Sequence, residues 1–159
     1  MLVMTTGRLA TPTRWLLAIV AIAAMTVVLG ACTPTPASAP SPVPASSLVN
    51  EINAQRAATG RAPVASDVGL TNIADGWGAH LAAIGALQHQ NIDAIPDWNA
   101  LGETVQQGQC GQSDQSIVAA WMNSPPHREV LLSTAFSAVG VARVCGADGR
   151  EWVVADFGG

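Results

Sequence analysis

The sequence contains no lysine, and charged residues make up only 11% of its 159 residues. Every aspartate and glutamate follows Cys32, whereas two of the arginines, Arg8 and Arg14, precede it. The chain after Cys32 is therefore more acidic than the formal net charge of -4 for the whole sequence. Because nucleic acids and anionic headgroups bind clustered basic side chains, this composition excludes nucleic acid as a partner.

Local ligand motifs are also absent: the sequence holds no HExxH or CxxC, so no short segment by itself indicates a zinc site. Neither Cys110 nor Cys145 has a neighbouring histidine that would activate it as a nucleophile. In an exported protein we expect a disulfide between them. It closes a loop of about 35 residues and stabilises the fold by roughly 3 to 4 kcal/mol on the chain-entropy model. A cysteine nucleophile is the alternative.

The most apolar run, Leu16 to Leu29, is shorter than the about 20 residues of a membrane-spanning helix. Preceded by two arginines, it is typical of a secretory signal peptide over residues 1–31, with a permanent anchor helix as the alternative. The run ends in Leu29-Gly-Ala-Cys32, which resembles the lipobox of bacterial lipoproteins. That resemblance implies lipidation of Cys32, with palmitate among its chains, and a protein held at the cell membrane on its extracytoplasmic side.

Residues 32–46 form a tract rich in proline, alanine and serine, with no periodic apolar face. Such a tract builds no core, and its prolines favour an extended polyproline II chain. We interpret it as a lipid-anchored spacer, with a proline-recognition ligand as the alternative. The folded domain is expected over residues 47–159.

Within that domain, apolar periodicity and helix-start signals predict helices first and strands late. We expect a helix from Ser47 to Thr59, a second that follows Ser66 and ends near His89, a third from Ser113 that stops before Pro125, and a short fourth that begins at Ser124 and Pro125. Extended segments are expected at Gly102–Gln106, Ser137–Cys145 and Arg150–Phe157, the last two joined by a hairpin at Asp148-Gly149. This order is typical of an α+β domain.

Three ionisable side chains lie at the ends of expected elements. His89 follows the second helix, Glu103 lies in the short extended segment, and His127 lies in the first turn of the fourth helix, where the helix dipole favours a neutral ring. Together they offer three ligands for zinc with an open position. Three unrelated polar residues are the alternative, and His80 is interpreted as an ordinary core or surface histidine.

Four motifs in order resemble the CAP (or SCP) superfamily of cysteine-rich secretory proteins, antigen 5 and pathogenesis-related proteins. They are Leu48 to Arg56, Leu101-Gly-Glu103-Thr-Val, Trp121-Met-Asn-Ser-Pro-Pro-His127-Arg, and Phe136 to Val141 together with Trp152 to Gly158. The resemblance implies a three-layer α-β-α sandwich with a small, largely antiparallel central sheet and a central cavity lined by histidine and acidic residues. Trp121 and Phe136 are then expected in the core.

Position by position, His89, Glu103 and His127 match family cavity residues, whereas Ser124 and Ala135 stand where plant and animal members carry a second Glu and a second His. We expect a monomeric binding module whose cavity takes a divalent metal, zinc, or a small apolar ligand, with a lipid or cell-wall component as partner. The alternatives are a cell-wall-facing adhesin and a peptidase-like hydrolase. The hydrolase uses His89 or His127 as base, Glu103 as orienting group or acid, and Ser124 or metal-bound water as nucleophile.

Overall fold

The computed structural model describes residues 45–159. The predicted signal peptide, Cys32 and all but the last two residues of the predicted spacer therefore lie outside the described residues. The helices are α1 (Ala45–Ala58), α2 (Val68–Ile84), the 3-10 turn η1 (Ile92–Ala94), α3 (Asp114–Asn123) and α4 (Pro125–Leu132). The strands are β1 (Ala65–Ser66), β2 (Leu101–Gln109), β3 (Ala138–Cys145) and β4 (Arg150–Gly158). Within residues 45–159, no helix has the length and hydrophobicity that a membrane span requires.

The four strands form one sheet in the order β1-β3-β4-β2, in which only the short β1 is parallel to its neighbour. The predicted hairpin between β3 and β4 is confirmed. Its turn contains Gly149 with φ 79°, and the Asp148 carboxylate accepts a hydrogen bond from the N–H of Arg150. Asp-Gly favours such turns because glycine adopts positive φ without steric cost.

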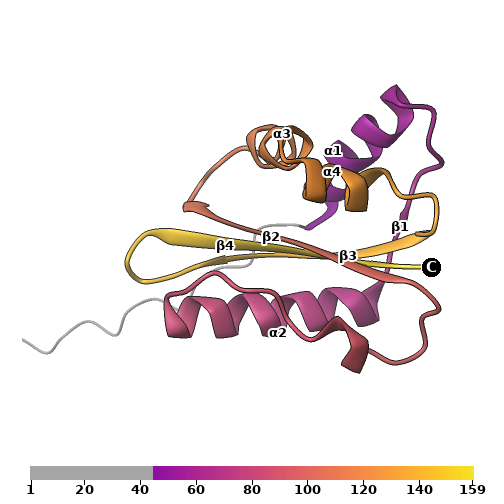
Figure 1. The fold of residues 1–159 in the computed structure, drawn as a ribbon. Helices are drawn as coiled ribbons and strands as arrows, with labels where there is room; N and C mark the ends of the chain where they lie inside the picture. Colours follow the sequence, from indigo (N-terminus) through magenta and orange to yellow (C-terminus); the bar gives the residue numbers. More distant parts are fainter. Residues whose placement is uncertain (1–44) are drawn as a thin grey trace, which may run out of the picture. The chain divides into compact units, whose positions relative to one another are not determined.

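Helices cover both faces of this sheet: α1, α3 and α4 lie on one side and α2 on the other (Figure 1). Because side chains alternate along a strand, β4 contributes to both cores. Val153, Ala155 and Phe157 pack in the cluster that contains the buried Trp121, whereas Trp152 and Val154 pack in the cluster of α2. The predicted α-β-α sandwich is confirmed, and Phe136 packs, partly buried, against the first cluster.

Helix α2 ends at Ile84, five residues before His89, so it is shorter than the predicted helix, which ends near this histidine. Gly85 terminates it in the left-handed conformation, with φ 66°, and its N–H donates to the Leu81 carbonyl. At the other end the cap is the Asp67 carboxylate rather than Ser66. Gly78 has a packing role, because a Cβ there would come within 2.9 Å of Val144.

The start of α4 is where the sequence predicts it, but one detail is wrong. Ser124 occupies the N-cap position, with Pro125 following, yet its hydroxyl makes no capping hydrogen bond. Its backbone carbonyl instead accepts from the Arg128 N–H at 2.9 Å. The fixed φ of Pro125 and the backbone bond therefore start this helix, and the Ser124 hydroxyl is free of the capping role.

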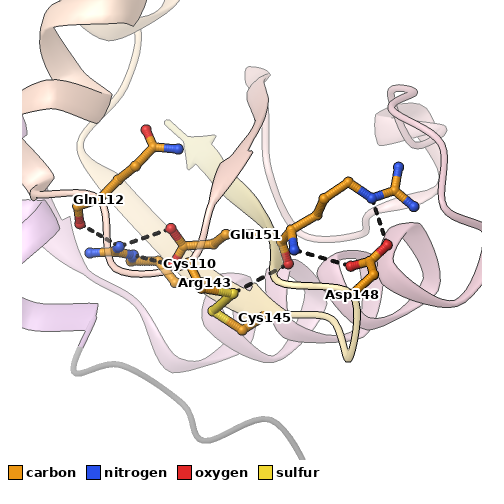
Figure 2. The surroundings of a disulfide bond; sticks show 7 residues. Cys110, Gln112, Arg143, Cys145, Asp148 and Glu151 are labelled. Carbon is orange, nitrogen blue, oxygen red and sulfur yellow. Dashed lines mark hydrogen bonds and ion pairs between the residues drawn. A yellow bond between two sulfur atoms is a disulfide. The ribbon is translucent and has the colours of Figure 1, made fainter.

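Cys110 and Cys145 form the predicted disulfide, with Cα atoms 5.6 Å apart. The bond joins the end of β2 to the end of β3 beside a buried ion-pair network (Figure 2). In this network the guanidinium of Arg143 donates to both oxygens of Glu151, to Asp114 at 2.6 Å and to the Gln112 carbonyl at 2.6 Å. This end of the sheet is held by a covalent bond and by fully paired charges.

Candidate functional site

His89 and Glu103, two of the three predicted site residues, are in direct contact. Glu103 projects from β2 and is buried, whereas His89 lies in the loop after α2 with 60% of its side chain exposed. The ring Nδ1 lies 2.5 Å from the Glu103 Oε1. A carboxylate on Nδ1 holds the imidazole in one orientation and leaves Nε2 as the outward nitrogen.

Two residues that sequence reasoning missed complete this cluster. Asp156 lies directly opposite Glu103 in the β2–β4 ladder and is 1% exposed. The side-chain amide of Gln90 donates to Glu103 Oε2 at 2.9 Å and to Asp156 Oδ1 at 2.8 Å. The backbone N–H of Gln90 also donates to Glu103 Oε1. The residue next to His89 therefore joins two buried carboxyl groups through one amide.

Asp156 is the least satisfied of these groups. Its Oδ2 atom is buried and has no hydrogen-bond partner within residues 45–159. Burial raises the pKa of Asp156 to about 7; the Gln90 hydrogen bond opposes this shift, and the charge of Glu103 adds to it. A buried carboxyl without a cation is more stable when it is protonated. The signal in the sequence was an aspartate inside the apolar run Trp152 to Phe157.

His127 lines a separate cleft, of about 420 Å³, beside β2. The walls are Val105, Gln106 and Gln107 from β2, Leu87 from the loop after α2, and Ala120, Trp121, Ser124 and His127 from α3 and its junction with α4. Burial lowers the pKa of His127, and the charge of His89 lowers it further. His127 is therefore neutral near pH 7, as the sequence predicts, and His89 is close enough to influence it.

These positions test whether a metal ion fits. The Glu103 carboxylate already accepts hydrogen bonds on both oxygens, one of them from His89. Within the described part of the chain, no three His, Cys, Asp or Glu side chains form a group that could hold a metal ion. The arrangement thus brings His89 and Glu103 together without forming the predicted three-ligand set with His127.

The other residues considered in the sequence analysis, Ser124 and His80, lie in different places. Ser124 and His127 share the cleft beside β2, whereas His80 is exposed and stacks on Trp77 with ring centroids 4.7 Å apart. A second hollow of about 480 Å³ is lined by Arg61, from the loop after α1, and by residues of α4 and the segment after it, among them Arg128 and Glu129. It contains none of the predicted site residues.

Comparison with known proteins supports the predicted family. The sequence pattern of the CAP, or cysteine-rich secretory protein, family matches residues 49–157. No curated protein sequence matches at a significant level. Similar solved structures include an outer surface protein from Borrelia burgdorferi, with a TM-score of 0.64 and 23% identity over 75% of this chain and 97% of that one.

Two further structures share the fold at lower identity. An extracellular protein containing an SCP domain from Bacillus anthracis has a TM-score of 0.59 and 17% identity, over 71% of this chain and 39% of that one. Venom allergen-like protein 4 from Schistosoma mansoni has a TM-score of 0.53 and 8% identity, over 70% and 83% of the two chains. The match to the family pattern spans most of the described residues, and the chain belongs to the cysteine-rich secretory protein (CAP) family.

Proposed function

We propose that this protein is an extracytoplasmic CAP-domain binding module, tethered to the membrane through a lipid on Cys32, whose cleft beside β2 takes an uncharged, largely apolar ligand. The lining of the cleft carries the proposal: its apolar residues are Leu87, Val105, Ala120 and Trp121, and no carboxylate or guanidinium from residues 45–159 lines it. Concave apolar pockets with a few polar groups are typical ligand sites. Those polar groups are Gln106, Gln107, Ser124 and the neutral His127.

Probe binding tests this proposal. The full-length chain in zwitterionic detergent is titrated with the uncharged fluorophore N-phenylnaphthylamine, and the signal of micelles alone is subtracted. Ala120→Trp fills the cleft and is expected to weaken binding by about tenfold or more, a free-energy change of roughly 1.4 kcal/mol. Ala119→Trp is the matched control, because Ala119 is also exposed on α3 but does not line the cleft. Equal binding by both variants contradicts the proposal.

The tether is tested separately. Cys32→Ala is expected to move the protein from the membrane fraction to the soluble fraction of the cell envelope, because lipid chains on this cysteine supply the attachment. The same amount of membrane-bound protein in the variant contradicts the lipid anchor without affecting the cleft.

A hydrolase is the second candidate, and the contact between His89 and Glu103 favours it. The pair resembles an oriented general base: a buried carboxylate on Nδ1 and an exposed ring. In a serine version the nucleophile would be the Ser124 hydroxyl, which makes no capping bond and lines the cleft with His127 rather than with His89. A labelled peptide library incubated with wild type, His89→Ala and Ser124→Ala tests this candidate. Cleavage that both variants retain would be due to another site or a contaminant.

A further inference from the structure

At one edge of the sheet, no second strand from residues 45–159 pairs with the outermost strand. Strand β2 pairs with β4 and lies at the end of the strand order. Beyond its two ends, the N–H of Gly159 donates to the Ala100 carbonyl, and the N–H of Cys110 donates to the Gly149 carbonyl. Because hydrogen-bonded and non-hydrogen-bonded pairs alternate in an antiparallel ladder, the even-numbered residues of β2 bond to β4. The odd-numbered residues direct their N–H and C=O groups to the free edge.

Three of these odd residues, Val105, Gln107 and Gln109, lie in the half of β2 that leads to Cys110. Within residues 45–159, no hydrogen bond reaches their backbone N–H or C=O groups. Val105 is nonetheless 4% exposed, so its backbone groups lie in a sheltered position. Unpaired backbone groups at such a position favour pairing with another extended chain.

The same stretch of β2 forms one wall of the cleft, through Val105, Gln106 and Gln107. Leu87 and His127, which come from different helical layers, belong to the opposite walls. Every lining residue is uncharged once His127 is neutral. The recess thus offers alternating backbone groups at a strand edge and space for uncharged side chains.

We propose that the free edge of β2 binds a short extended peptide with uncharged side chains, which adds to the sheet as a further strand and places an apolar side chain in the cleft. This inference rests on the proposed function, since it concerns the same cleft and names the class of its ligand. Backbone pairing supplies affinity in this mode of recognition, and pockets for alternate side chains supply specificity.

A second copy of the chain is a poorer occupant. The acidic balance of the chain, with 11 acidic and 7 basic residues, adds repulsion between copies.

Peptide selection provides the test. The full-length chain in zwitterionic detergent is used to select from displayed random linear peptides of about eight residues, a length within the normal range of strands. An enriched peptide is then synthesised with N-methyl groups on alternate residues, in two complementary sets. Strand addition predicts that one set weakens binding by about tenfold or more and that the other changes it by less than about twofold.

Variants of the protein test the same contact from the other side. Gln107→Pro removes an N–H at the free edge and leaves the hydrogen bonds between β2 and β4 intact, so it is expected to weaken peptide binding by about tenfold. Gln107→Ala is the matched control, because it removes the side chain and keeps the N–H. If Gln107→Pro does not fold, Gln109→Pro replaces it, and the methylated peptides still decide the question with the wild-type chain.

Three results would overturn the inference: no enriched peptide, equal effects of the two methylated sets, or a wild-type dimer that Gln107→Pro dissociates in light scattering. The last result would assign the edge to self-association. If N-phenylnaphthylamine still binds and Ala120→Trp still weakens its binding by about tenfold or more, the cleft remains a ligand site and only the peptide is rejected. If neither a peptide nor N-phenylnaphthylamine binds, the proposed function is rejected as well.

Discussion

Strand β4 carries two buried carboxyl groups that are satisfied in different ways. Glu151 is fully buried and accepts two hydrogen bonds from Arg143, at 2.9 and 3.0 Å. Asp156 is 1% exposed and accepts one hydrogen bond, from the amide of Gln90, while its second oxygen has no partner within residues 45–159. At the Glu151 end of β4 the buried carboxylate is paired with a cation, and we call this the compensated end. At the Asp156 end no cation from the described part of the chain pairs with the buried carboxyl, and we call this the uncompensated end.

The difference separates a structural end from a candidate site. Burial by itself would lower the pKa of Arg143, but Glu151 and Asp114 raise it, so the guanidinium stays charged. At the other end, burial raises the pKa of Asp156 to about 7. Uncompensated buried carboxyl groups cost stability and concentrate at functional sites. The end of β4 with Asp156, Glu103 and His89 is therefore a second candidate site, apart from the cleft beside β2.

The largest effect is expected at the compensated end. Arg143→Met leaves Glu151 buried without a cation and should destabilise the domain by about 3 to 5 kcal/mol. Urea unfolding under non-reducing conditions measures it. Adding Glu151→Leu to this variant should restore part of the loss, because the uncompensated charge is then removed. No restoration would mean that Arg143 acts mainly by packing.

The disulfide at the same end should have the next largest effect. Replacing Cys110 and Cys145 by serine frees a loop that spans 35 positions and should reduce the free energy of unfolding by roughly 3 to 4 kcal/mol. The midpoint of urea unfolding measures the change. Binding of N-phenylnaphthylamine at low temperature should persist, because the cleft is lined by other residues.

The uncompensated end predicts an unusual pH dependence. A carboxyl whose pKa is raised in the folded state contributes stability below its unfolded pKa and loses it as pH rises through the folded value. Because of Asp156, the free energy of unfolding of the wild type should fall by on the order of 2 to 4 kcal/mol as the pH rises from about 4 to about 8. Asp156→Asn, which stays neutral, should lack this loss in urea unfolding followed across pH. Parallel pH curves for the two proteins would contradict the raised pKa.

Gln90 should give a smaller effect. Gln90→Ala removes the amide that donates to Glu103 and Asp156, which should cost about 1 to 3 kcal/mol. Gln88→Ala is the matched control, since the Gln88 side chain is exposed and its amide makes a long contact, 3.5 Å, with His80. Equal stabilities of the two variants in thermal unfolding would show that water replaces the amide.

Sequence patterns predict the order of helices and strands well where the apolar periodicity agrees with the capping and turn residues. Ser113, Pro125 and Asp148-Gly149 mark true boundaries because caps, prolines and tight turns act locally. The pattern failed at the end of α2, which it places near His89, because Gly85 terminates the helix earlier in the left-handed conformation. It also missed β1, whose two residues are strand only through their pairing with β3.

The candidate site was predicted in part. The pairing of His89 with Glu103 agrees with the expectation that they lie together, and it follows from the family motifs rather than from spacing. Asp156 and Gln90 were missed because their roles depend on strand register and on a loop conformation that sequence periodicity does not encode. For the same reason, the sequence did not reveal that Glu103 already has hydrogen-bond donors on both oxygens.

Amide chemical shifts of the isotope-labelled chain during titration with N-phenylnaphthylamine test the central claim most directly. We predict that shifts gather at Val105, Gln107, Ala120 and His127, which belong to the cleft, and that Arg143 and Cys145 at the compensated end stay unchanged. Shifts that gather around Arg143 and Cys145, or no saturable shifts at the cleft, would contradict the assignment of ligand binding to the cleft beside β2.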